Sequence, residues 1–187
     1  MKLTLVFAAL SVIFLTSCNS STSETLIAKN QLGPLNPQTK VEKLDSILVK
    51  DSIAEFNIQS KFNRTKEIEV FNKNGEVSLI IEPNYQNDSI VSISEIQILD
   101  PSYETKKGLN INSNFKEIYE NYKIDNIQNS INSIILSIDE IGAYIVIDKK
   151  HLPSELKFDS EIKIESNQIP DEAPLRYFWL KFDDQNS

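Results

Sequence analysis

The chain has 187 residues with one cysteine and one histidine, and its formal net charge is −8 at pH 7. An acidic surface repels phosphate backbones, which argues against nucleic-acid binding, and so few Cys and His side chains exclude the ordinary zinc ligand sets. The four glycines are far apart in the sequence, so they form no glycine-rich loop that could bind a phosphate group. Nucleotide-binding enzymes are therefore excluded, and we expect no cofactor.

The first residues have the organisation of a secretory signal. Lys2 is followed by an apolar run from Leu3 to Leu15 and then by the small residues Thr16 and Ser17. The run is shorter than the roughly 20 residues that span a bilayer. We therefore expect residues 1–17 to be a signal peptide and not a transmembrane anchor.

The segment Leu15-Thr16-Ser17-Cys18 resembles the lipobox of bacterial lipoproteins. The resemblance implies cleavage before Cys18 and acylation of its thiol and new amino group with fatty acids such as palmitate. It also implies a protein anchored in the cell envelope, at the outer membrane, facing the periplasm or the cell surface. An ordinary signal peptide with a chance cysteine is the alternative. The Ile-, Asn- and Lys-rich composition is similar to that of Bacteroidota proteins.

Polar and turn-forming residues follow the cysteine. Residues 19–25 are polar, and Gly33, Pro34 and Pro37 indicate a loop. We expect residues 18–38 to be the lipidated cysteine and a flexible tether, and residues 39–187 to be one domain. Thr39 is expected to cap a helix over residues 40–50, with Glu42 completing a capping box.

The spacing of apolar residues changes from residue 66 onward, where apolar and polar residues alternate as in a strand. Two strands around the turn Asn72-Lys73-Asn74-Gly75 predict a hairpin. Residues 83–88 are expected to form another turn. A third strand is expected over residues 90–99, and its apolar pattern changes phase near Ser94, which predicts a bulge there.

A second unit begins after Gly108. Ser113 is expected to cap a helix over residues 114–122. Strands are expected at 133–139, 143–148 and 176–182, with weaker candidates at 156–158 and 162–164. The sequence thus predicts an α+β fold, mainly antiparallel sheet with two or three short capped helices.

The halves 33–105 and 106–187 share an order of loop, capped helix and strands. An internal duplication explains this order, and so does the general similarity of capped helices. The segment from Thr105 through Gly108 and Ser113 to Ile118 resembles the helix start of small periplasmic lipoproteins and β-lactamase-inhibitor-like tandem modules. This resemblance implies a helix packed on an antiparallel sheet that binds a protein partner, and it carries over no functional residue.

No catalytic or metal-binding residue is expected. The only histidine, His151, precedes Leu152-Pro153 and is interpreted as a loop or capping residue. Acid pairs occur at Asp139-Glu140, Asp171-Glu172 and Asp183-Asp184. Neighbours in sequence cannot by themselves face one cleft, so solvated turns are the favoured interpretation.

The closing strand carries aromatic residues on both faces. Phe178 shares one face with Leu180 and Phe182, and Tyr177 shares the other with Trp179. A strand covered on both faces is the favoured interpretation. The alternative is that Tyr177 and Trp179 lie on an exposed sheet face and contact a partner or a sugar.

Three Asp-Ser-Ile segments, containing Ser46, Ser52 and Ser89, are similar to the O-glycosylation acceptor motif of Bacteroidota. Our functional expectation is a lipid-anchored, non-enzymatic module that binds another envelope protein or a ligand. The alternative is a secreted carbohydrate-binding module or a hydrolase that uses carboxylates beside Trp179. Two acids converging in a cleft beside that residue would favour the alternative.

Overall fold

The computed structural model describes residues 24–59, 64–86 and 89–183 and confirms the α+β class. Within these ranges no helix is long and apolar enough to cross a membrane. The strands are β1 (Leu26–Ala28), β2 (Gln31–Leu32), β3 (Ser52–Gln59), β4 (Arg64–Phe71), β5 (Val77–Gln86), β6 (Ser89–Ile98), β7 (Glu104–Thr105), β8 (Asn126–Asn129), β9 (Ser133–Ile138), β10 (Ala143–Asp148) and β11 (Tyr177–Lys181). The helices are α1 (Leu44–Ile47), α2 (Phe115–Asn121) and α3 (Ser154–Lys157), with 3-10 turns η1 (Val41–Lys43), η2 (Lys149–His151) and η3 (Ser166–Gln168).

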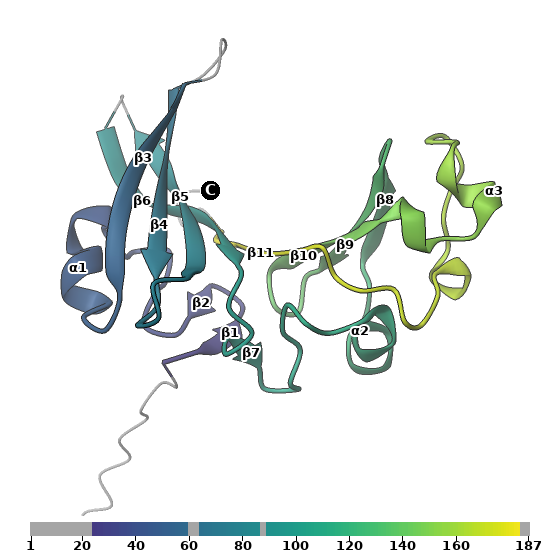
Figure 1. The fold of residues 1–187 in the computed structure, drawn as a ribbon, viewed down its shortest axis with the longest axis horizontal. Helices are drawn as coiled ribbons and strands as arrows, with labels where there is room; N and C mark the ends of the chain where they lie inside the picture. Colours follow the sequence, from purple (N-terminus) through teal and green to yellow (C-terminus); the bar gives the residue numbers. More distant parts are fainter. Residues whose placement is uncertain (1–23, 60–63, 87–88, 184–187) are drawn as a thin grey trace, which may run out of the picture.

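Eight strands form one antiparallel sheet in the order β3-β4-β5-β6-β11-β10-β9-β8. The order is symmetric about the central β6–β11 pair, because each half contributes four strands that are consecutive in the chain. A small sheet, β2-β1-β7, lies beside it. The long sheet curves, so that β3–β6 at one end and β8 at the other rise on the same side of β10 and β11 (Figure 1).

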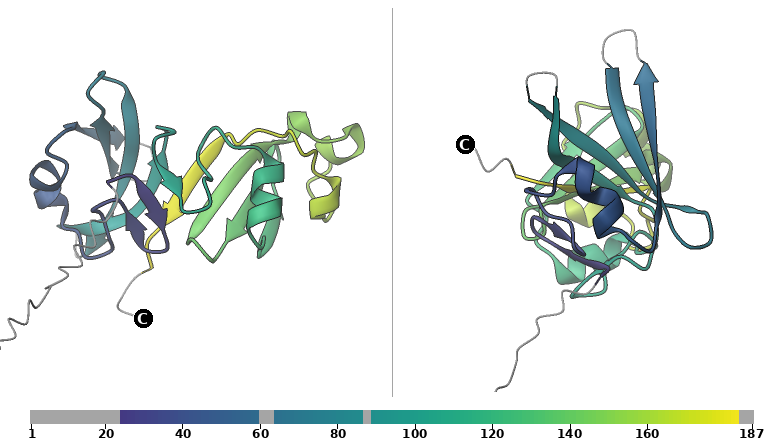
Figure 2. Two further views of the ribbon diagram at one scale, coloured as in Figure 1. Left: turned by 90° about the horizontal axis from the view of Figure 1, so that it is seen from below. Right: turned by 90° about the vertical axis from the view of Figure 1, so that its left-hand side faces the viewer.

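One face of the long sheet forms the hydrophobic core. Every second residue of β9, β10 and β11 is buried, including Ile145, Phe178 and Leu180. Phe115 and Ile118 of α2 belong to this core, as does Ile27 of β1. Figure 2 shows α2 and the small sheet lying across the covered face when the molecule is seen from below. The opposite face carries the half-buried and exposed residues of the same strands.

The predicted strands are largely confirmed, and the bulge near Ser94 is present. Glu82 pairs with Glu95 while Pro83 pairs with Ile93, so Ser94 is the extra residue of β6. The turn predicted at 83–88 is wrong, because β5 continues through Pro83 to Gln86. The pairing of β5 with β4 has ended by this point, at Ile81, so the missing amide of Pro83 is tolerated there.

Several helical predictions are corrected. Thr39 caps no helix, and the predicted helix 40–50 is reduced to η1 and α1, neither of which has a side-chain cap. The cap of α2 is Asn114, which forms a capping box with Glu117, and not Ser113. Residues 156–158 and 162–164 form no strand, and α3 occupies part of the first range. The strands β3 and β8 were not predicted.

The tether is also shorter than expected. Residues 26–35 were assigned to it, but they form β1 and β2, and Ile27, Leu32 and Leu35 are buried in the core. Gly33 adopts a φ of 52° and donates its amide to the carbonyl of Leu26 at 2.8 Å. The glycine and proline residues that predict a loop here therefore belong to the folded domain.

The same turn precedes the helical segment in each half. The amide of Asn36 donates to Oγ1 of Thr39 at 3.0 Å, and the amide of Asn110 donates to Oγ of Ser113 at 3.2 Å. The side chain of each asparagine also accepts a 2.9 Å bond from the amide two residues later. Repeated turns and a symmetric strand order are what duplication of one unit would produce.

Candidate interaction surface on the open face of the sheet

A row of side chains crosses the uncovered face at the centre of the sheet. Its register joins Gln97 of β6 to Trp179 of β11, Tyr144 of β10 and Ser137 of β9. The alternation of each strand directs these four residues away from the core, and all four are half-buried. The row thus lies where the two halves of the sheet meet.

Two aromatic rings stack at the middle of this row. The rings of Tyr144 and Trp179 are 5.8 Å apart between centroids and are inclined by 7°. Phe178 and Leu180, the neighbours of Trp179 in the chain, are fully buried on the other face. The favoured expectation of a strand covered on both sides therefore differs from the structure, in which Trp179 is half-buried and Tyr177 is 37% exposed.

Carboxylates lie beside the aromatic pair. The hydroxyl of Tyr144 donates a 2.6 Å hydrogen bond to Oε2 of Glu95, and Glu95 lies directly opposite Glu82 in the register. Burial raises the pKa of the Glu82 carboxyl, and the charges of Glu95 and Glu67 raise it further. Burial, together with the Glu95 carboxylate, also raises the pKa of the Tyr144 hydroxyl. Like charges directly opposite on a sheet are destabilising, so their placement on an open face marks a candidate site.

Cationic residues border the same face. Lys181 lies opposite Glu95 in the register of β11 and β6. Arg176 contacts Asp148 and lies over the ring of Tyr177, with 4.9 Å from the guanidinium carbon to the ring centroid. The face is therefore acidic over β5 and β6, aromatic at its centre and mixed in charge toward Arg176.

The other predicted residues do not join this surface. Cys18 lies outside the described residues. Ser52 starts β3 and is exposed, and Ser46 is exposed and donates to the carbonyl of Lys43 at 2.8 Å. Ser89 starts β6, and its side chain lies outside the described set. His151 ends η2 and is half-buried.

The acid pairs predicted to be solvated lie on turns and are exposed where the structure describes them. Asp139-Glu140 follows β9, Asp171-Glu172 precedes β11, and Asp183 follows β11. Within the described ranges no group of three or more metal-ligating side chains could hold a metal ion. The acids on the same face of the sheet as Trp179 are instead Glu82 and Glu95, which the sequence analysis does not single out.

A signal for one of these missed residues exists in the sequence. Tyr144 alternates with the apolar residues Ala143 and Ile145, so it stands on the polar face of its predicted strand. An aromatic residue at such a position indicates a surface role or a cross-strand partner. No sequence signal joins Tyr144 to Trp179 or Glu82 to Glu95, because those pairs depend on strand register.

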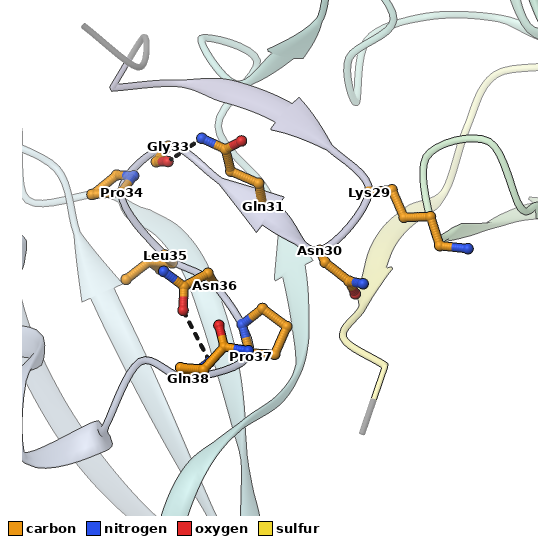
Figure 3. Close-up of a pocket in the computed structure, with 9 residues that line it drawn as sticks. All are labelled: Lys29, Asn30, Gln31, Gly33, Pro34, Leu35, Asn36, Pro37 and Gln38. Carbon is orange, nitrogen blue, oxygen red and sulfur yellow. Dashed lines mark hydrogen bonds between the residues drawn. The ribbon is translucent and has the colours of Figure 1, made fainter. Parts of the chain in front are cut away.

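Cavities also lie elsewhere among the described residues, and three of them are well defined. The first, about 380 Å³, is lined by residues 29–38 around the β1–β2 turn, where Figure 3 shows Asn36 hydrogen-bonded to Gln38. The second, about 520 Å³, lies beside α1 and is lined in part by Leu48 and Tyr103. The third, about 610 Å³, is bordered by the exposed residues Ile131 and Phe158.

Comparison with known proteins identifies the fold alone. No protein family matches the chain, and no curated protein matches it either. Among solved structures, the chain is similar to the crystal structure of the uncharacterized protein yfeY from Escherichia coli, with a TM-score of 0.58 and 13% sequence identity. The match covers 84% of this chain and 99% of that one.

Proposed function

We propose that this protein is a lipid-anchored, non-enzymatic module of the bacterial envelope that binds another protein through the open face of its long sheet. The observation that carries the proposal is the stacked pair Tyr144 and Trp179, held half-buried at the centre of that face. Stacked aromatic rings on a rigid sheet offer a large contact area at little entropic cost, as interface hot spots do.

The charges beside the pair favour a basic partner. Glu82 is repelled by the charges of Glu95 and Glu67 on the acidic part of the face. An arginine or lysine of the partner would neutralise this repulsion and could also lie over the ring of Trp179. We therefore infer a protein surface that presents arginine or lysine side chains.

The anchor position supports binding on this face. The described chain starts at Glu24, a few residues after Cys18, and its first strand, β1, packs on the covered side of the sheet. A lipid at Cys18 would hold that side toward the membrane. The open face would then point away from the bilayer, toward envelope proteins.

The alternative is sugar binding or hydrolysis by Glu82 and Glu95, and the aromatic pair beside these acids favours it. Glycosidases place two carboxyl groups on either side of the scissile bond. Here the two acids are direct cross-strand neighbours that project from the same face, with the hydroxyl of Tyr144 donating to Glu95. This side-by-side geometry fits recognition of a cation better than hydrolysis.

Site-specific photocrosslinking in the native membrane tests the proposal. A photoreactive residue replaces Lys181, which is exposed on the open face, and in a matched control it replaces Lys116, which is exposed on α2 at the covered side. We expect a protein adduct from position 181 alone. Trp179→Ala should abolish it, and the double change Glu82→Gln and Glu95→Gln should reduce it.

Three outcomes would contradict the proposal. Equal adducts from positions 181 and 116 would show nonspecific contact, and an adduct of twice the protein's own mass would show self-association. Binding of an oligosaccharide array that Trp179→Ala abolishes, without any protein adduct, would favour the carbohydrate-binding alternative.

A further inference from the structure

The second cavity is a separate feature of the molecule. It lies between Leu48 and Asp51 after α1, the β4–β5 turn around Lys73, and the loop from Asp100 to Tyr103, and its volume is about 520 Å³. Volumes of roughly 300–1,000 Å³ are typical of small-molecule sites. None of the open-face residues Glu82, Glu95, Tyr144 and Trp179 lines it.

The hydroxyl of Tyr103, at the wall of this cavity, has no protein partner among the described residues. The residue as a whole is only 8% exposed. Burial raises the pKa of Tyr103 to about 12, and the charges of Asp51, Asp100 and Glu24 add to the shift. The hydroxyl therefore faces three carboxylates that line the same cavity. A hydroxyl at a cavity wall that makes no hydrogen bond to the chain is available to a ligand, and its oxygen can accept a hydrogen bond from a cationic donor.

The three carboxylates differ in their hydrogen-bond partners. Asp100 accepts from the amide of Ser102 at 2.8 Å and from Asn72 at 3.1 Å. Glu24 accepts from Lys50 at 2.7 Å. Within the described chain no side-chain donor forms a hydrogen bond with the carboxylate of Asp51. Burial raises the pKa of Asp51, and the charges of Asp100 and Glu24 raise it further.

The remaining lining limits the kind of ligand. Ile47, Leu48 and Pro34 provide an apolar wall. Lys50 and Lys73 also line the cavity. Lys50 is ion-paired with Glu24 and its charge partly offsets the rise in the pKa of Asp51, but among the described residues no cation contacts the Asp51 carboxylate directly. Among the described residues, no group of three or more His, Cys, Asp or Glu side chains could hold a metal ion. A cation larger than a metal ion, with an apolar part, fits these features.

We propose that this cavity binds a small organic cation, a primary amine on a short alkyl chain. The ammonium group donates hydrogen bonds to the carboxylate of Asp51 and the hydroxyl oxygen of Tyr103, and Asp100 adds its negative charge. The alkyl chain packs on Leu48 and Ile47, where burial of each methylene is favourable. This site does not depend on the protein partner proposed above.

Isothermal titration of the full chain with n-pentylamine and with 1-pentanol at pH 7 tests the site. The two probes have similar size, and only the amine is charged. We expect the amine to bind at least tenfold more tightly than the alcohol. Asp51→Asn should weaken amine binding at least tenfold, because it removes the negative charge and leaves a neutral amide oxygen as the acceptor. Tyr103→Phe should weaken it about threefold, because it removes the hydroxyl acceptor.

The matched control is Asp171→Asn, on an exposed turn, which should leave binding unchanged. Thermal unfolding of every variant checks that it is folded, and Lys73→Ala, which should strengthen amine binding, keeps the test valid if Asp51→Asn does not fold. Equal affinity for amine and alcohol or no effect of Asp51→Asn in a folded variant would overturn the proposal. So would the absence of binding at an amine concentration of about 10 mM, which detects a Kd of about 1 mM.

Discussion

The hydroxyl of Tyr144 on β10 donates a 2.6 Å hydrogen bond to Glu95 on β6 and so reaches past β11, the strand between them. The bond links the two halves of the long sheet across its central strand. It also holds the Tyr144 ring nearly parallel to that of Trp179. One polar contact therefore positions the aromatic centre of the proposed binding surface.

We expect Tyr144→Phe to lower the free energy of unfolding by about 1 kcal/mol, because it removes a half-buried hydrogen bond to a carboxylate but keeps the ring. A double-mutant cycle with Glu95→Gln, measured by chemical denaturation, should give a coupling energy of similar size. Additive effects of the two changes would show that the bond contributes nothing to stability.

Trp179→Ala should weaken partner binding by about 2 kcal/mol or more, as at interface hot spots. Because the ring is half-buried, the change should cost only about 1–2 kcal/mol of folding stability. Phe178→Ala, on the buried face, is the matched control and should cost about 3–5 kcal/mol. Tryptophan fluorescence reports the single indole directly, and a strongly blue-shifted emission would contradict its half-buried position.

Glu82 should make the protein less stable as the pH rises. Burial raises the pKa of Glu82 in the folded protein above the ordinary value of a glutamate, so the folded protein favours the protonated carboxyl and loses stability when the pH rises through the raised pKa. Glu82→Gln should therefore raise the melting temperature at pH 7 relative to wild type and have little effect at pH 4. Glu172→Gln, on an exposed turn, serves as the control. A stabilisation that is equal at both pH values would contradict the assignment.

Gly33→Ala should destabilise the start of the domain. A Cβ at this position would lie 2.1 Å from the carbonyl oxygen of Glu24, and the φ of 52° is unfavourable for other residues. We expect a loss of about 2 kcal/mol or more in unfolding free energy. Gly75→Ala is the control, because its φ of 79° carries the conformational cost alone and a Cβ there meets no atom within 4 Å. Equal losses would show that the close approach to Glu24 is unimportant.

Cys18→Ala should abolish acylation, because the thiol is the acyl acceptor in the predicted lipobox. Labelling with a fatty-acid analogue followed by membrane fractionation measures this. Ser17→Ala keeps a small residue before the cysteine and should be labelled like wild type. Equal label on wild type and Cys18→Ala would refute the lipoprotein assignment.

The strands around Asn72 and Gly75 and the bulge at Ser94 could be predicted because alternation and turn residues are local signals. The helical caps were harder, since Thr39 and Ser113 bond to the turn before the helical segment and not to its first amides. Strand β3 was missed because its apolar alternation is irregular. The folded segment 26–35 was missed because its burial depends on distant residues.

The candidate site could be predicted in part. The alternation of β11 divides Tyr177 and Trp179 from Phe178, and this division is confirmed. Which of the two faces is covered depends on where α2 and the small sheet pack, and the sequence interpretation of a doubly covered strand did not foresee an open face. Glu82 and Glu95 are thirteen positions apart in the chain and become neighbours through the β5–β6 register.

The sequence by itself determined the class of the fold, most of the strands and the alternation of their faces, because these depend on interactions between residues close in the chain. It also predicts the lipid anchor at Cys18, which depends on a short linear motif. Only the tertiary structure decided that Tyr144 stacks on Trp179, that Glu95 faces Glu82 and that Tyr103 lies in a cavity with Asp51. Those relationships follow from strand register and from the packing of distant segments, which the burial of the whole core selects.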